Sequence, residues 1–155
     1  MRNRQTSAKL SNRTKAKTFA ICWLLLWTRL AATAAVVSLS AARLHCEYLD
    51  HPMGMDVPNP QLGWVLTSRE RGDKQTAYQI IVASSPATLE RNDGDDWDSG
   101  KVTSDESTLI TYLGKPLVSL QTCFWKVRVW DQYDHASAWS TAASWTMGLL
   151  NSNDW

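Results

Sequence analysis

The densest group of chemically competent side chains in the sequence is a set of four aspartates between positions 93 and 98. Their oxygen atoms could bind calcium. A calcium loop of the EF-hand kind, however, needs a glycine at its sixth position and a glutamate at its twelfth, and a loop that starts at Asp93 or Asp96 has neither. We therefore interpret the segment as a solvated turn whose aspartates bond to nearby backbone, and predict no metal site there.

Pairs of carboxylates could also hydrolyse a glycosidic bond if they stood about 5 to 9.5 Å apart across a sugar-sized cleft. Asp95 with Asp98, or Asp105 with Glu106, could meet that separation. A domain of this size offers loop tips rather than a deep cleft that excludes water. We therefore predict no catalytic residue in this chain.

Other motifs for catalysis or cofactor binding are missing from the sequence. The three histidines share no metal-ligand spacing with a cysteine or an acid; they are His45, His51 and His135. No glycine-rich phosphate loop is present, and no serine lies in a nucleophile-elbow pattern. We predict no metal and no cofactor.

A tryptophan-rich run near the C-terminus is the best candidate for a functional surface. Alternation with a period of two, typical of a half-buried strand, places Cys123, Trp125, Val127 and Val129 on one face. The opposite face and the next strand of the expected hairpin carry the predicted docking or ligand face, which consists of Phe124, Lys126, Arg128, Trp130 and Trp139. Aromatic rings and cations in such a row are suited to cation–π stacking.

Three functions of this aromatic and cationic face remain open from the sequence. It could stiffen the hairpin through contacts within the chain, dock another domain, or stack against a sugar. An exposed aromatic patch of several hundred Å² would favour docking or ligand binding.

The elements that position this face have the short spacing of an all-β sandwich. The expected strands are 45–49, 62–66, 77–83, 97–102, 108–112, 122–131 and 143–147, with one helical turn starting at Ser85 and Pro86. We predict a seven-stranded immunoglobulin-like or fibronectin type III-like β-sandwich. Alternation gives its core as Trp64, Leu66, Tyr78, Ile80, Val82, Ile110, Trp125, Val127, Val129, Trp145 and Met147.

The first 42 residues are predicted to be an export signal. A basic stretch precedes an apolar core from Phe19 to Trp27, and small residues with several cleavage options follow. A cut after Ser40 or Ala42 fits this pattern, and an uncleaved N-terminal anchor is the alternative. We expect a secreted or periplasmic protein that meets a membrane only through this segment, with the sandwich at 43–148 and the start of a linker at 149–155.

Charge separates the two parts of the chain. The segment before residue 43 has seven Lys and Arg residues and no acid, whereas residues 43–155 have nine Lys and Arg against fifteen Asp and Glu. The predicted domain is therefore acidic, which argues against a nucleic acid as partner because phosphate binding requires a basic surface.

Export would permit a disulfide between Cys46 and Cys123. We expect Cys46 to start the first strand and Cys123 to start the sixth, at opposite ends of the sandwich. A disulfide needs Cα atoms within about 7 Å. This reasoning favours two buried free thiols.

Several motifs in register resemble one known family over residues 44–155. They are Leu44-His45-Cys46-Glu47-Tyr48-Leu49, Pro60-Gln61-Leu62-Gly63-Trp64, Gln75-Thr76-Ala77-Tyr78-Gln79-Ile80, Trp97-Asp98-Ser99-Gly100-Lys101-Val102 and Phe124-Trp125-Lys126-Val127-Arg128-Val129-Trp130-Asp131. Together they resemble the N-terminal fibronectin type III-like module of bacterial α-L-rhamnosidases of glycoside hydrolase family 78. Asp134 stands where such modules usually have a turn glycine.

The resemblance implies an enzyme that removes terminal α-L-rhamnose by inversion, with acidic residues on a large (α/α)6 barrel further along the chain. No position in this sequence matches that barrel, so no catalytic residue is carried over. We expect a non-catalytic accessory module, in a truncated or fragment form, whose partners are the other domains of the rhamnosidase and a rhamnosylated carbohydrate. The alternative is a stand-alone carbohydrate- or protein-binding module that uses the aromatic and cationic face.

Overall fold

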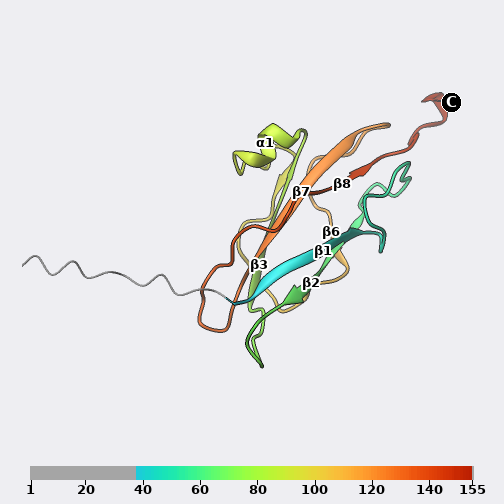
Figure 1. The fold of residues 1–155 in the computed structure, drawn as a ribbon. Helices are drawn as coiled ribbons and strands as arrows, with labels where there is room; N and C mark the ends of the chain where they lie inside the picture. The colour runs from blue at the N-terminus through green and yellow to red at the C-terminus, as the bar shows by residue number, and fades with distance from the viewer. Residues whose placement is uncertain (1–37, 155) are drawn as a thin grey trace, which may run out of the picture. The chain divides into compact units, whose positions relative to one another are not determined.

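The computed structural model describes residues 38–154, which form two antiparallel β-sheets with a shared core (Figure 1). The smaller sheet has the order β1-β2-β6, with β1 at Ser40–Cys46, β2 at Gln61–Thr67 and β6 at Ile110–Thr111. The larger sheet has the order β4-β3-β7-β8, with β5 also paired to β3. Its strands are β3 (Ala77–Ala83), β4 (Trp97–Asp98), β5 (Val102–Thr103), β7 (Thr122–Trp130) and β8 (Ala143–Thr146). The predicted all-β, immunoglobulin-like class is confirmed.

The centre of the larger sheet is the pairing of β3 with β7, in unbroken register from Ala77 opposite Trp130 to Ala83 opposite Phe124. Both strands are rich in β-branched and aromatic residues, which suit a pleated, buried surface. Strand β7 also pairs with β8. The face predicted to be functional therefore lies on a central strand with a fixed register.

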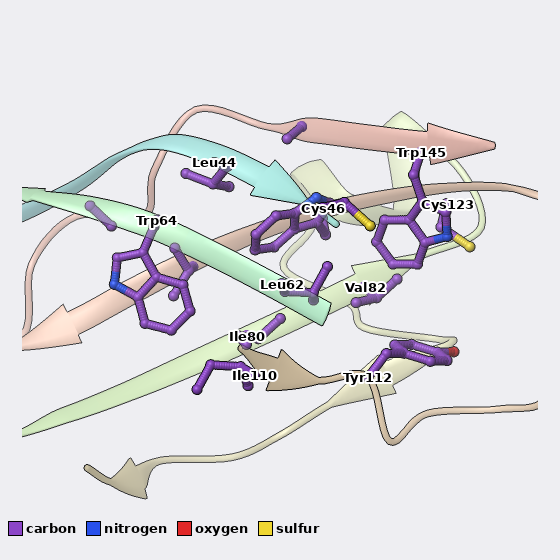
Figure 2. Close-up of a cluster of buried hydrophobic side chains, with 14 of the residues drawn as sticks. Leu44, Cys46, Leu62, Trp64, Ile80, Val82, Ile110, Tyr112, Cys123 and Trp145 are labelled. Atoms are coloured by element: carbon purple, nitrogen blue, oxygen red, sulfur yellow. The ribbon is translucent and has the colours of Figure 1, made fainter. Parts of the chain in front are cut away.

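The core between the sheets agrees with the sequence pattern. Ten of the eleven predicted core residues are buried, and Leu66 is partly buried against them. Figure 2 shows how Trp64 and Leu62 from the smaller sheet face Ile80 and Val82 from the larger one. Fully burying side chains of this size stabilises a fold by about 1.5 to 3 kcal/mol each.

Helix α1 (Pro86–Glu90) forms at the predicted position. The Ser85 side chain caps it by accepting a hydrogen bond from the Thr88 backbone at 3.2 Å, and Pro86 begins the first turn. The helix buries Leu89 against Ile81 and Ala83, in a small second cluster on the outer side of the larger sheet.

The first strand differs from its prediction. We expected residues 45–49, but β1 is Ser40–Cys46, and the backbone turns at Glu47 and Tyr48, which have φ values of 49° and 63°. Leu39 and Ala41 are 2 % and 7 % exposed and belong to the core. The small, apolar residues that we assigned to a signal cleavage region are thus partly strand residues, whereas positions 1–37 of the expected signal lie outside the described residues.

The expected strand 97–102 is two short strands, β4 and β5, so the described sandwich has eight strands instead of seven. The chain leaves the ladder between them at Gly100, whose φ of 61° suits glycine. Asp134, at the usual glycine position, has a φ of 65°, a left-handed conformation that aspartate tolerates better than most residues.

The two cysteines lie at the same end of the sandwich, so our placement at opposite ends was wrong. Cys46 ends β1 instead of starting it, while Cys123 lies at the start of β7 (Figure 2). Both are free and buried, as we expected. Burial raises the pKa of each thiol to about 12, with further contributions from neighbouring charges.

Candidate functional site

The five residues of the aromatic and cationic face are brought together by one strand and one loop. Phe124, Lys126, Arg128 and Trp130 lie in β7, as predicted. Trp139 lies in the connection between β7 and β8 and not on the next strand as we expected. That connection follows β7 closely, because the Ser137 and Ser140 backbone amides donate to the Val129 and Val127 carbonyls, each at 2.8 Å.

Cations and indole rings alternate across this face. The guanidinium carbon of Arg128 lies 4.7 Å from the Trp139 ring centroid and 5.0 Å from that of Trp130. The Lys126 ammonium lies 5.4 Å from the Trp139 centroid. All three distances are within the range of about 6 Å for cation–π attraction.

A third cation, Lys101, completes the row and was missed by the sequence analysis. Its ammonium lies 4.9 Å from the Trp130 ring centroid and forms an ion pair with Asp134. Lys101 belongs to the segment between β4 and β5, which is 29 positions from Trp130 in the chain. No local pattern connects the two residues, because only the pairing of β5 and β7 with β3 brings them together.

Arg128 is further fixed by a neighbour on β3. Its Nε and Nη2 atoms donate to Gln79 Oε1 at 3.0 and 2.7 Å. Gln79 in turn donates from Nε2 to Asp98 Oδ1 at 2.7 Å. The row is thus held by hydrogen bonds across β7, β3 and β4 as well as by stacking.

Much of this face is already covered by the chain itself. Trp130 and Lys126 are 8 % and 9 % exposed, while Phe124, Arg128 and Trp139 are half-buried. Burial lowers the pKa of Lys126, and the nearby Glu90 carboxylate opposes that change. These contacts form a ladder within the chain, the arrangement that the stiffening hypothesis predicts. Its role as a docking or ligand face stays a prediction.

A cavity of about 240 Å³ borders this face, beneath helix α1. Its lining residues are Pro86, Leu89, Glu90, Phe124, Lys126, Ser140 and Ala142. A larger cavity, of about 370 Å³, lies where β4, β5 and β6 leave the sandwich open, and Tyr78 and Trp97 form part of its wall. Burial, together with the Glu106 charge, raises the pKa of Tyr78.

The aspartates of 93–98 take part in local hydrogen bonds. Asp95 accepts from the Ser84 backbone and hydroxyl at 2.9 and 2.6 Å, and the hydroxyl bond is the main cause of its lowered pKa. Asp98 accepts from the Gly100 amide at 2.9 Å, which closes a short turn. Burial and the Asp95 charge raise the pKa of Asp96. The Asp98 bond agrees with the predicted turn, whereas Asp95 bonds to Ser84, eleven positions earlier in the chain.

Residues 38–154 contain no cluster of three or more histidine, cysteine or acidic side chains placed to hold a metal ion. In the same range, no helix has the length and apolar character needed to cross a membrane.

Comparison with known proteins decides the family. The family described as "Rha78A-like, N-terminal immunoglobulin domain" matches residues 41–151. The chain belongs to the Rha78A-like N-terminal immunoglobulin domains. This finding confirms the resemblance that the sequence motifs indicated.

Relatives of this Rha78A-like domain are much longer proteins. An α-L-rhamnosidase of Streptomyces avermitilis is 46% identical over 109 residues, which cover 70% of this chain and 10% of the relative. The solved α-L-rhamnosidase of "Dictyoglumus thermophilum" is 45% identical with a TM-score of 0.73, over 75% of this chain and 13% of that one. The solved Streptomyces avermitilis α-L-rhamnosidase in complex with L-rhamnose is 43% identical with a TM-score of 0.72. The match covers 76% of this chain and 11% of that one.

The Rha78A-like chain therefore spans about a tenth of the length of the curated relatives it matches. The shared part in each is a β-sandwich, and the matching family is described as N-terminal.

Proposed function

We propose that this chain is a non-catalytic accessory module of an α-L-rhamnosidase, the enzyme class that hydrolyses terminal α-L-rhamnose from glycans or glycosides. The observation that carries the proposal is the family match over residues 41–151, which covers the described sandwich almost completely. The module packs against other domains of that enzyme and so supports their position. The partners are accordingly the remaining domains and, through them, a rhamnosylated carbohydrate.

The side chains of the sandwich support a structural role. Asp95 and Asp98, one of the carboxylate pairs considered from the sequence, are held by hydrogen bonds from the Ser84 and Gly100 amides. The indole of Trp130, which a sugar would need as a platform, is 8 % exposed and carries two cations of its own chain. A sugar that stacked there would have to displace these contacts.

The proposal includes export from the cell, to the periplasm or the medium. Its support is the basic and then apolar sequence pattern before residue 38. Because Leu39 and Ala41 belong to the core, we place the end of the export segment before Leu39 and not after Ser40 or Ala42. Mass spectrometry of the mature N-terminus tests this placement, and a mature chain that starts at residue 41 or 43 would contradict it.

The non-catalytic role is tested by assaying the pure full chain with an aryl α-L-rhamnoside, beside the Streptomyces avermitilis α-L-rhamnosidase as a positive control. We expect release of the aryl group by the control and none above the buffer blank by this chain. Turnover that copurifies with the chain and follows its concentration would overturn the proposal.

A further inference from the structure

Three segments meet at one end of the sandwich, which we call the exit end. They are the loop 47–60 between β1 and β2, the loop 112–121 between β6 and β7, and the segment 147–154 after β8. Gly148 joins all three, because its amide donates to the Met55 carbonyl at 2.6 Å and its carbonyl accepts from the Leu120 amide at 3.0 Å. Figure 1 shows the last described residues leaving from this end, beyond β8.

The segment after β8 stays attached to the exit end for several more residues. The Leu150 amide donates to the Ser119 hydroxyl oxygen at 2.8 Å, and that hydroxyl donates to the Asp154 carboxylate. Gly148 also passes close to the loop 47–60, since a Cβ at this position would lie 2.9 Å from the Gly54 carbonyl oxygen. The direction in which the chain leaves is therefore set by the two loops.

Exposed apolar side chains are concentrated at the same end. Among the described residues, seven of the ten exposed large hydrophobic side chains belong to the two loops, which together hold only 24 residues. Three of them lie at, or within two positions of, residues whose backbones contact Gly148. They define what we call the exit patch: Met53, Val118 and Leu120, which are 84%, 61% and 67% exposed. Exposed apolar side chains concentrated in one region of a domain indicate an interaction site.

Backbone strain at Leu120 accompanies the exposure of its side chain. Leu120 has a φ of 63°, in the left-handed region that is an outlier for a bulky residue. Its turn is closed by the Gln121 amide, which donates to the Val118 carbonyl at 3.2 Å. Within the domain a glycine would suit this position better and would expose less apolar surface. Strain that the domain itself does not need points to a function outside it.

We propose that the exit patch is the surface on which the next domain of an α-L-rhamnosidase docks. This inference rests on the proposed function and names its contact surface. The occupant follows from two observations. The part shared with this N-terminal family is 10% of the Streptomyces avermitilis relative, so about nine times more residues lie outside it. The segment after β8 leaves between Met55 and Leu120, whose backbones bond to Gly148. A domain that follows this segment along the chain meets the exit end first.

Hydrogen–deuterium exchange on a fusion protein tests the proposal. The full chain is fused at Trp155 to the Streptomyces avermitilis α-L-rhamnosidase from which the matching segment has been removed. Exchange is then compared, peptide by peptide, between the fusion and the free full chain. We expect exchange in 47–60 and 112–121 to be about fivefold slower or more in the fusion, because docking shields both loops.

A triple variant, Met53→Asp, Val118→Asp and Leu120→Asp, removes the exit patch. We expect exchange in 47–60 and 112–121 of the variant fusion to be as fast as in the free chain. Exchange in the rest of the module should not change, since all three side chains are exposed and their replacement leaves the core intact. The matched control is Val65→Asp with Tyr133→Asp, two exposed hydrophobic residues outside these loops, at 41% and 70% exposure. This control should keep the full slowing.

The other outcomes separate the inference from the proposed function. Slowing confined to other peptides, such as those of β7, would overturn the docking surface and leave the module role intact. Unchanged exchange throughout the module would overturn both. A free chain that sediments as a dimer, and becomes a monomer in the triple variant, would overturn the proposed occupant in favour of a second copy.

Discussion

Arg128 lies between two indole rings, with its guanidinium carbon 4.7 Å from the Trp139 centroid and 5.0 Å from the Trp130 centroid. Gln79 fixes its orientation through two hydrogen bonds to one amide oxygen. This arrangement joins β3, β7 and the loop after β7 on the outer side of the larger sheet.

Replacing Arg128 by methionine, which keeps an apolar stem, should lower the free energy of unfolding by about 1–2 kcal/mol, because it removes two cation–π contacts and the bonds to Gln79. Urea denaturation followed by tryptophan fluorescence measures this difference. Arg91→Met, at an exposed position on the C-terminal side of α1, is the control and should change stability little. An Arg128→Met protein as stable as the parent would show that the ladder does not stiffen the hairpin.

Gln75 is a buried amide whose three hydrogen bonds fix its orientation. Its Oε1 accepts from Trp64 Nε1 at 3.0 Å, and its Nε2 donates to the Ser104 and Glu106 carbonyls at 3.2 and 2.7 Å. We expect Gln75→Ala to cost about 2–4 kcal/mol, since it leaves buried polar groups without partners.

The substitution Gln75→Glu should lower the free energy of unfolding more at pH 7 than at pH 4, because an ionised carboxylate would face two carbonyl oxygens. Denaturant melts at both pH values, with the parent chain measured alongside, check this expectation. Equal losses at the two pH values would contradict the assigned orientation of the amide.

Gly63 lies directly under the ring of His45 on the paired strand. A Cβ at Gly63 would be 2.3 Å from His45 Nε2, so the imidazole has to move. We expect Gly63→Ala to cost about 1–3 kcal/mol through this overlap. In a His45→Ala background the same change should cost almost nothing. A double-mutant cycle by thermal denaturation gives the coupling, and additive effects would refute the contact.

The two thiols should make the domain less stable at alkaline pH. Their folded pKa of about 12 is above the value of 9.0 for a free thiol, so their contribution is fully present below pH 9 and is lost as the pH rises toward 12. From pH 7 to pH 10 we expect a loss of about 1 kcal/mol for each thiol. Guanidinium melts at both pH values measure it. The double variant Cys46→Ala, Cys123→Ala should show a smaller difference between them, and an unchanged pH dependence would exclude the thiols as its cause.

Leu39 tests where the folded domain begins. The side chain is 2 % exposed and lies in the main core, although the sequence places it in a run of small and apolar residues. Leu39→Ala should lower the unfolding free energy by about 2–4 kcal/mol, as buried leucine truncations do. Leu113→Ala, at 74% exposure, is the matched control and should have little effect. Similar effects of the two changes would place residue 39 outside the folded domain.

Much of the fold could be predicted because strand alternation is a local property. The pattern of Trp125, Val127 and Val129 identifies a buried face without knowledge of any partner strand. The start of β1 could not be predicted in this way, because Ser40 and Ala41 resemble signal-peptide residues and only their pairing with Thr67 and Leu66 in β2 reveals a strand. The expected positions of the two cysteines were wrong for the same reason. A first strand at 45–49 would begin near Cys46, whereas the true β1 ends at Cys46.

The sequence by itself determined the sandwich class, the composition of the core and, through motifs in register, the family. It also identified the five residues of the aromatic and cationic face. Only the tertiary structure decided that Lys101 completes this face, that Trp130 is largely covered, and that the two loops carrying the exit patch meet at Gly148. The physical reason is that each of these relationships joins segments far apart in the chain, whose proximity depends on strand pairing and loop closure rather than on local pattern.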